Sequence, residues 1–309
     1  PREVEFDTVR QTLTLALRRL TDLNREPVPG SALYAAFVSV CHDHRLHFFD
    51  REFDSQAQLL VHMREYARYH NTDLELALEE EEAPFTSLPM RYRQLLLDII
   101  GKPLYNAYTL AVMVVQPSRS ALRKIQRDLS ALPEAVRAQI EVIASFWIQI
   151  LLERGAFDKS LPAHVREQVV EFARPPKYNA PLRDFERQLK EGGGLIDTQL
   201  KLLRESLYAV LSEQDEQGLA YLKPTALALR LAFDDTWLRC MACGNLQHAP
   251  LLGRCVVCGA QELVACPPDD PATAARYDYY RQPLREVLRG ARPAHLTAEE
   301  HTAQLSQRD

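Results

Sequence analysis

The sequence predicts a mainly α protein with α+β parts, consisting of a helical middle and a small zinc ribbon near the C-terminal end. Apolar residues recur at three- and four-residue spacing through most of the central chain, which is typical of helices with one buried face. Two Cys-x-x-Cys pairs lie within residues 240–258, a spacing typical of a metal site. The 309 residues are 46% hydrophobic and 26% charged, which suits two or three globular domains.

The first predicted domain, residues 1–78, is a small α+β unit. Leucines and other apolar residues at helical spacing predict a helix over 6–24. The stretches 33–41 and 45–49 are expected to form two short strands joined by a turn. A second helix is predicted over 55–70, and the Glu-rich stretch 79–84 is interpreted as a solvated linker.

The second predicted domain, residues 87–175, is mostly helical. Prolines near the predicted helix starts support this interpretation, because proline is tolerated in the first helical turn. Long apolar stripes at helical spacing indicate buried faces rather than cofactor contacts. The predicted helices are 90–100, 104–115, 118–130, 133–154 and 161–173.

Residues 182–233 are predicted to form two helices, 182–190 and 195–212, followed by a strand at 225–233 that leads to the ribbon. The triple glycine at 192–194 is interpreted as a flexible hinge, because it lacks the Gly-Lys-Ser/Thr ending of a phosphate-binding loop. The ribbon itself is predicted over 237–265, and residues 266–309 form the last segment.

The strongest chemical signal is the set Cys240, Cys243, Cys255 and Cys258. Two residues between the cysteines of a pair let one tight turn aim both sulfurs at the same ion, and zinc favours four thiolates in a tetrahedron. The glycine after each pair permits the backbone to bend back. Four cysteines close the coordination shell, so the single zinc is predicted to be structural. A redox pair or four free thiols are the alternatives, and Cys266 and His248 are spare candidate ligands.

Weaker signals are three groups of residues outside the ribbon. Cys41, His42, His44 and His47 could bind a metal, or they could be polar residues of a turn. Arg119, Arg123 and Arg127 share one helical face that could neutralise phosphates, although a solvated helix face has the same pattern. A second basic stretch has similar weight: Lys177, Arg183, Arg187 and Lys190.

The whole-chain properties narrow the class of function. The net charge of −5 means that any nucleic-acid contact needs a local basic stripe. The sequence lacks a Gly-x-Ser-x-Gly motif, a His-Glu-x-x-His motif and a Walker phosphate loop. With no secretory signal and no long apolar run, cysteine pairs indicate a reducing compartment, so we expect a cytoplasmic protein without membrane contact.

The last third resembles a large helicase group. Trp-Leu-Arg-Cys-Met-Ala-Cys-Gly at 237–244, Cys-Val-Val-Cys-Gly at 255–259 and Tyr-Asp-Tyr-Tyr-Arg-Gln-Pro-Leu at 277–284 are similar to one portion of the superfamily 2 DEAD/DEAH-box helicases that carry a four-cysteine cluster. Members of that group occur in anti-phage defence systems such as DISARM and Druantia. Residues 298–306 resemble the segment that opens the second RecA-like domain of those helicases.

The resemblance implies roles for particular residues. The four cysteines would be zinc ligands, and Glu300, His301, Thr302 and Gln304 would lie near the cleft between motor domains. The phosphate-binding loop, the DExx box and the arginine-finger motif of these motors are missing from the sequence. ATP and Mg²⁺ would therefore be bound only by motor domains outside this segment. We expect the segment alone to be non-catalytic.

Two hypotheses follow from these observations. The first is an accessory, zinc-bearing segment of an ATP-dependent helicase or translocase in bacterial anti-phage defence, with DNA and defence-system proteins as partners. The second is a stand-alone zinc-stabilised helical adaptor that binds a protein partner.

Overall fold

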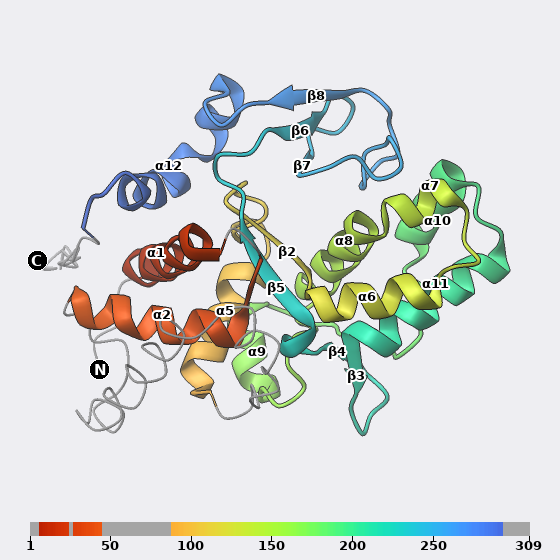
Figure 1. Ribbon diagram of the computed structural model, residues 1–309, viewed down its shortest axis with the longest axis horizontal. Helices are drawn as coiled ribbons and strands as arrows, with labels where there is room; N and C mark the ends of the chain where they lie inside the picture. The colour runs from red at the N-terminus through yellow and green to blue at the C-terminus, as the bar shows by residue number, and fades with distance from the viewer. Residues whose placement is uncertain (1–5, 25–26, 45–87, 293–309) are drawn as a thin grey trace, which may run out of the picture.

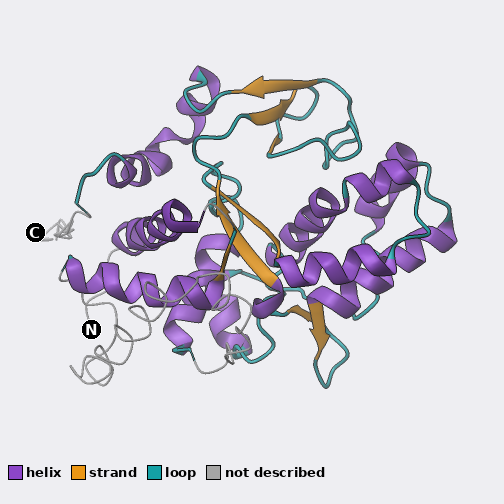
Figure 2. Cartoon of the chain, in the orientation of Figure 1, coloured by secondary structure: helices purple, strands orange, loops and turns teal. Residues whose placement is uncertain are grey.

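The computed structural model describes residues 6–24, 27–44 and 88–292, and it is mainly helical with three small antiparallel sheets (Figures 1 and 2). The predicted fold class is therefore confirmed. The helices are α1 Phe6–Asn24, α2 Gly30–Asp43, α5 Met90–Gly101, α6 Arg119–Asp128, α7 Glu134–Ala138, α8 Ile140–Leu152, α9 Ala163–Val169, α10 Arg183–Gly193, α11 Asp197–Leu211 and α12 Pro271–Leu288, with a 3₁₀ turn η2 at Pro224–Ala226.

The strands are short. They are β1 Val28–Pro29, β2 Met113–Pro117, β3 Ser212–Gln214, β4 Ala220–Leu222, β5 Leu227–Leu231, β6 Trp237–Cys240, β7 Leu246–Gln247 and β8 Leu263–Cys266. The central sheet has the order β1-β5-β2, and Val115 pairs with Leu229 in its antiparallel register. Figure 1 shows α1 and α2 on one side of β2 and β5, with α6 and α8 on the other.

The central sheet joins segments that are far apart in the sequence. Its strands come from 1–78, 87–175 and 182–233, and one continuous set of buried apolar side chains runs from Val9 in α1 to Leu284 in α12. The domain boundaries given above remain predictions. No helix in the described residues combines the length and apolar character that crossing a bilayer requires.

Two predicted elements differ from the structure. Residues 33–41, predicted as a strand, belong to helix α2, which is buried on nearly every side. Periodicity cannot separate a short buried strand from a helix that is apolar all round. The predicted strand 45–49, the helix 55–70 and the linker 79–84 lie outside the described residues.

Residues 104–115 were predicted as a helix, but they form a compact loop and then β2. Asn106 organises the loop: its Nδ2 donates to the carbonyl of Lys102, and its Oδ1 accepts from the backbone N–H groups of Tyr108 and Thr109. Asparagine stabilises turns through such local hydrogen bonds. Leu104 and Ala111 adopt positive φ angles of 70° and 55°, which a helix does not allow.

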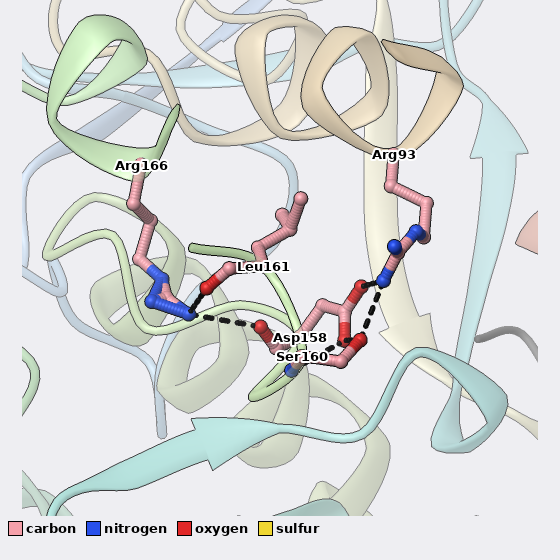
Figure 3. A network of polar contacts seen from close by, with 5 residues as sticks. All are labelled: Arg93, Asp158, Ser160, Leu161 and Arg166. Carbon is pink, nitrogen blue, oxygen red and sulfur yellow. Dashed lines mark hydrogen bonds and ion pairs between the residues drawn. The ribbon is translucent and has the colours of Figure 1, made fainter. Parts of the chain in front are cut away.

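A buried ionic network fastens α5 to α9 (Figure 3). Arg93 Nη1 contacts Asp158 Oδ2 at 2.7 Å, and the side chains are 10% and 4% exposed. Asp158 Oδ1 accepts from the backbone N–H and the hydroxyl of Ser160. Arg166 Nη2 donates to the carbonyls of Asp158 and Leu161, and its guanidinium lies 4.3 Å from the ring centroid of Tyr221. The carboxylate is thus paired and hydrogen-bonded on both oxygens.

Candidate metal centre

The four predicted ligands converge at one point. Cys240 ends β6, Cys243 follows it in a tight turn, and Cys255 and Cys258 come from the loop between β7 and β8. All four Sγ atoms lie within 4.8 Å of one another. Cys240 Sγ lies 3.5 Å from Cys258 Sγ, and Cys243 Sγ lies 3.7 Å from Cys255 Sγ. A tetrahedral zinc site with Zn–S bonds of about 2.3 Å places its sulfurs about 3.8 Å apart, so the donor set fits this ion.

Each cysteine pair is shaped by the same backbone hydrogen bonds. The Gly244 N–H donates to the carbonyl of Cys240 at 2.9 Å, and the Gly259 N–H donates to that of Cys255 at 3.0 Å. These glycines have φ angles of +73° and +77°, the left-handed region that the sequence predicted. Two equivalent turns therefore face each other across the four sulfurs.

The thiols of the cluster differ in acidity. Burial raises the pKa of Cys240, but hydrogen bonds from the backbone N–H groups of Cys243 and Ala242 outweigh it, so that pKa falls to about 7. Burial away from solvent raises the pKa of Cys243, and hydrogen bonds that it makes with the neighbouring thiols also raise it, to about 12. Four thiolates cannot coexist here without a compensating cation, which a divalent metal supplies.

Gln247 links the second cysteine turn to the rest of residues 237–266, called here the metal lobe. Its fully buried amide donates to the carbonyls of Ala249 and Arg254 at 2.7 and 3.1 Å, and its Oε1 accepts from the Val256 N–H at 3.0 Å. Such a satisfied buried amide fixes the loop that carries Cys255 and Cys258. Sequence reasoning did not identify this residue, because a single glutamine carries no distinctive pattern.

The metal lobe is seated against the helical body. A Cβ added at Gly193 would lie 2.9 Å from Leu252 Cδ1, and one added at Gly259 would lie 2.5 Å from Gln188 Oε1. Leu252 also donates its N–H to Gln139 Oε1 at 2.9 Å. The triple glycine, interpreted above as a hinge, instead ends α10 and allows this close approach, with Gly194 in the left-handed conformation.

The two spare candidate ligands lie elsewhere. Cys266 is buried in β8, and His248 directs Nδ1 toward the hydroxyl of Tyr108 at 3.2 Å. The His248 ring packs 4.8 Å from that of Phe146, and Trp237 stacks edge-on against Tyr108 at 5.2 Å. This aromatic cluster lies between the metal lobe and α8, and the sequence alone did not reveal it.

The environment of His248 predicts a dependence of stability on pH. Burial and the nearby positive charge of Arg230 lower the pKa of His248 to about 4, against the smaller opposing effect of Asp235. In the unfolded chain that pKa is about 6.5. Between about pH 4 and about pH 6.5, the two pKa values of His248, the unfolded state therefore binds more protons than the folded state. The contribution of neutral His248 to stability is complete above about pH 6.5 and is lost as the pH falls toward about 4.

We expect His248 to make the protein less stable by up to about 2 kcal/mol at about pH 5 than at about pH 7. Chemical denaturation of the wild type and of His248→Phe at both pH values measures this effect, and the variant should show the smaller pH dependence. An equal pH dependence in the two proteins would contradict the assignment.

The other predicted site residues are separate from the metal centre. Arg119, Arg123 and Arg127 lie on the exposed face of α6, opposite the buried Ala121 and Ile125. Their role in nucleic-acid binding remains a prediction. Residues of the motor-cleft motif fall outside the described part of the chain: Glu300, His301, Thr302 and Gln304.

The structure gives less support to the other two groups, the one around Cys41 and the second basic stretch. Cys41 is buried in α2, and in the described part of the chain neither it nor His44 belongs to a group of three or more potential ligands. The second basic stretch is interspersed with carboxylates, since Arg187 pairs with Asp184 at 3.0 Å and Lys190 with Asp197 at 2.9 Å.

Comparison with known proteins gives one relative. The chain is 32% identical to Druantia protein DruE of Escherichia coli (strain UMEA 4076-1) over 318 residues, which cover 100% of this chain and 17% of that protein. The chain thus spans 17% of the length of the curated relative that it matches. No family model matches the chain, and no solved structure matches it. The expected resemblance to a Druantia protein is confirmed.

Proposed function

We propose that this chain is the metal-bearing accessory region of an ATP-dependent nucleic-acid helicase or translocase in bacterial anti-phage defence. The similarity to a Druantia protein along the whole chain carries the proposal and supports the role in defence. The four-cysteine centre, compatible with zinc, supports it further. The ATP, the Mg²⁺ and the motor chemistry are supplied by domains other than this one, and DNA is the proposed substrate.

In this proposal the metal is structural. It fixes the lobe of residues 237–266 against α10 and α8, so that the surfaces on either side keep a constant geometry during translocation. The exposed arginines of α6 provide positive charge for nucleic-acid phosphates on one of these surfaces. The residues Glu300 and His301 are proposed to lie near the motor cleft, as the resemblance implies.

Replacing Arg119, Arg123 and Arg127 together with alanine is expected to weaken DNA binding and its salt dependence. Loss of three phosphate contacts should lower the log–log salt slope by about 2 to 3. Fluorescence anisotropy over a range of salt concentrations measures both quantities. The matched control replaces Arg183, Arg187 and Lys190, which lie among carboxylates, and it should change neither. An unchanged slope in the α6 variant would remove α6 from the DNA surface.

The alternative function is a zinc-stabilised adaptor that binds a protein partner through the helical middle. The observation that favours it is the exposure of large apolar side chains there, with Leu104 at 74% and Phe172 at 73%. Co-purification of another protein of the same defence system with the wild type, but not with Leu104→Ser and Phe172→Ser, would support it. Unchanged co-purification would count against this surface.

A further inference from the structure

Helix α12 and the loop before β2 carry an exposed group of tyrosine rings, called here the tyrosine cluster: Tyr105, Tyr279 and Tyr280. The ring of Tyr280 packs 4.3 Å from that of Tyr105, in the loop before β2, and 5.1 Å from that of Tyr279. Tyr279 is 84% exposed, Tyr280 37% and Tyr105 39%. Aromatic faces left open to solvent in this way form a surface suited to a flat aromatic ligand.

The rings are held on a firmly seated helix. Asp270 caps α12 by accepting from the backbone N–H and the hydroxyl of Thr273, both at 2.8 Å. Gln11 of α1 donates to the carbonyl of Pro283 at 3.3 Å, and the buried guanidinium of Arg281 lies 4.8 Å from the Phe233 ring centroid. Figure 1 shows α12 between β8 and α1. Tyr279 and Tyr280 are therefore carried on a helix that is fixed to the rest of the fold.

The segment that carries Tyr279 and Tyr280 has an excess of positive charge. Residues 276–292 contain five arginines and two carboxylates, although the whole chain has a net charge of −5. Of the two carboxylates, Asp278 is held by Arg285 through two contacts of 2.9 Å, and Glu286 accepts from Gln282. Three of the arginines are exposed: Arg276, Arg289 and Arg292.

Arg276 lies next to the metal lobe, and its guanidinium carbon is 5.2 Å from the centroid of the Tyr277 ring. It lies one helical turn before Tyr279 and Tyr280, on the same side of α12. Its Nη1 lies 3.8 Å from the position that a Cβ would take on Gly244 of the first cysteine turn. A phosphate contacted by Arg276 would thus lie between the metal lobe and the tyrosine cluster.

We propose that Tyr105, Tyr279 and Tyr280 form a base-stacking platform for single-stranded nucleic acid, with Arg276 contacting the phosphate backbone. Open aromatic faces accept any unpaired base, and nearby arginines follow the backbone charge. The bases of a duplex are already stacked on one another, so they cannot stack on the tyrosine rings. This inference deepens the proposed function and rests on it, but it uses a surface different from α6.

The test measures binding of the intact chain to a labelled single strand of about 20 nucleotides of mixed sequence at low salt. Tyr279→Ala combined with Tyr280→Ala is expected to weaken binding about tenfold or more, and Tyr279→Phe combined with Tyr280→Phe should restore it to within about twofold, because phenylalanine keeps the ring face. Phe172→Ala removes another exposed aromatic ring, which lies elsewhere and is 73% exposed, and it should leave affinity for the single strand unchanged. Zinc content and circular dichroism confirm that each variant is folded.

Several outcomes would overturn the inference. If the double alanine variant binds the single strand as the wild type does, the platform is wrong while the proposed function stands. Equal losses for single strand and duplex would also overturn it, since a duplex cannot stack on the rings. Loss of a protein partner without loss of oligonucleotide binding would show a protein interface instead. If the wild type binds neither nucleic acid, the inference and the nucleic-acid role both fail.

Discussion

Replacing Cys255 with serine is expected to abolish metal binding and to unfold residues 237–266 while the helical body stays folded. Cys255 is fully buried, and its sulfur lies 3.7 Å from that of Cys243. Structural zinc contributes on the order of 10 kcal/mol of apparent binding free energy in such sites, far more than the short strands of this lobe supply. Most of the apolar side chains that pack around the central sheet and α8 come from outside this lobe, so their structure should persist.

Metal analysis and amide hydrogen exchange check this result. The variant should contain no zinc, and exchange should rise throughout residues 237–266 but not in α8. The control is Cys266→Ser, because Cys266 is also buried in the lobe but lies outside the cluster of four sulfurs. This control should retain one zinc per chain. Retention of zinc by Cys255→Ser, or collapse of the entire helical signal, would contradict the account.

Asp158→Ala is expected to cost about 3 to 5 kcal/mol of stability, because it leaves a buried guanidinium without its counter-charge. Asp158 bridges Arg93 and Ser160 and is 4% exposed as a side chain. Chemical denaturation followed by circular dichroism measures the free energy of unfolding. The network ties α5 to the loop before α9, so the loss should appear as a lower midpoint of a cooperative transition.

An exposed ion pair serves as the control for Asp158. Asp184→Ala removes the partner of Arg187, and these side chains are 85% and 59% exposed, so the cost should stay below about 1 kcal/mol. Replacing both Arg93 and Asp158 with apolar residues should recover part of the lost stability, since the guanidinium of Arg93 is then no longer buried without its carboxylate partner. A cost below about 1 kcal/mol for Asp158→Ala would show that the network contributes little.

Local patterns explain why much of the fold could be predicted. The apolar stripe of α1 indicates a helix and the alternating residues of β5 indicate a strand, and the structure has a helix at Phe6–Asn24 and a strand at Leu227–Leu231, within the predicted ranges. The sequence could not distinguish α2 from a strand, because its residues are buried all round. It also could not anticipate that Asn106 would turn the chain after Lys102, since that outcome depends on pairing of β2 with a strand far away in sequence.

For the metal centre too, local features could be predicted from the sequence, and contacts between distant segments could not. Spacing alone brings Cys240 close to Cys243, and the glycine after each pair shows how the turn closes. The seat of the lobe depends instead on contacts between distant segments, such as Leu252 against Gly193. The triple glycine is the signal that could have predicted this contact, because glycine permits close approach as well as flexibility. The tyrosine cluster also could not be predicted from the sequence, since Tyr105 and Tyr280 are far apart along the chain.

The most direct test of an accessory region that depends on a motor elsewhere is ATP hydrolysis by the purified chain, with and without single-stranded DNA, in samples of measured zinc content. The account predicts one zinc per chain and no turnover under either condition. ATP turnover stimulated by DNA would contradict it, because the chain would then contain a nucleotide site and a motor of its own.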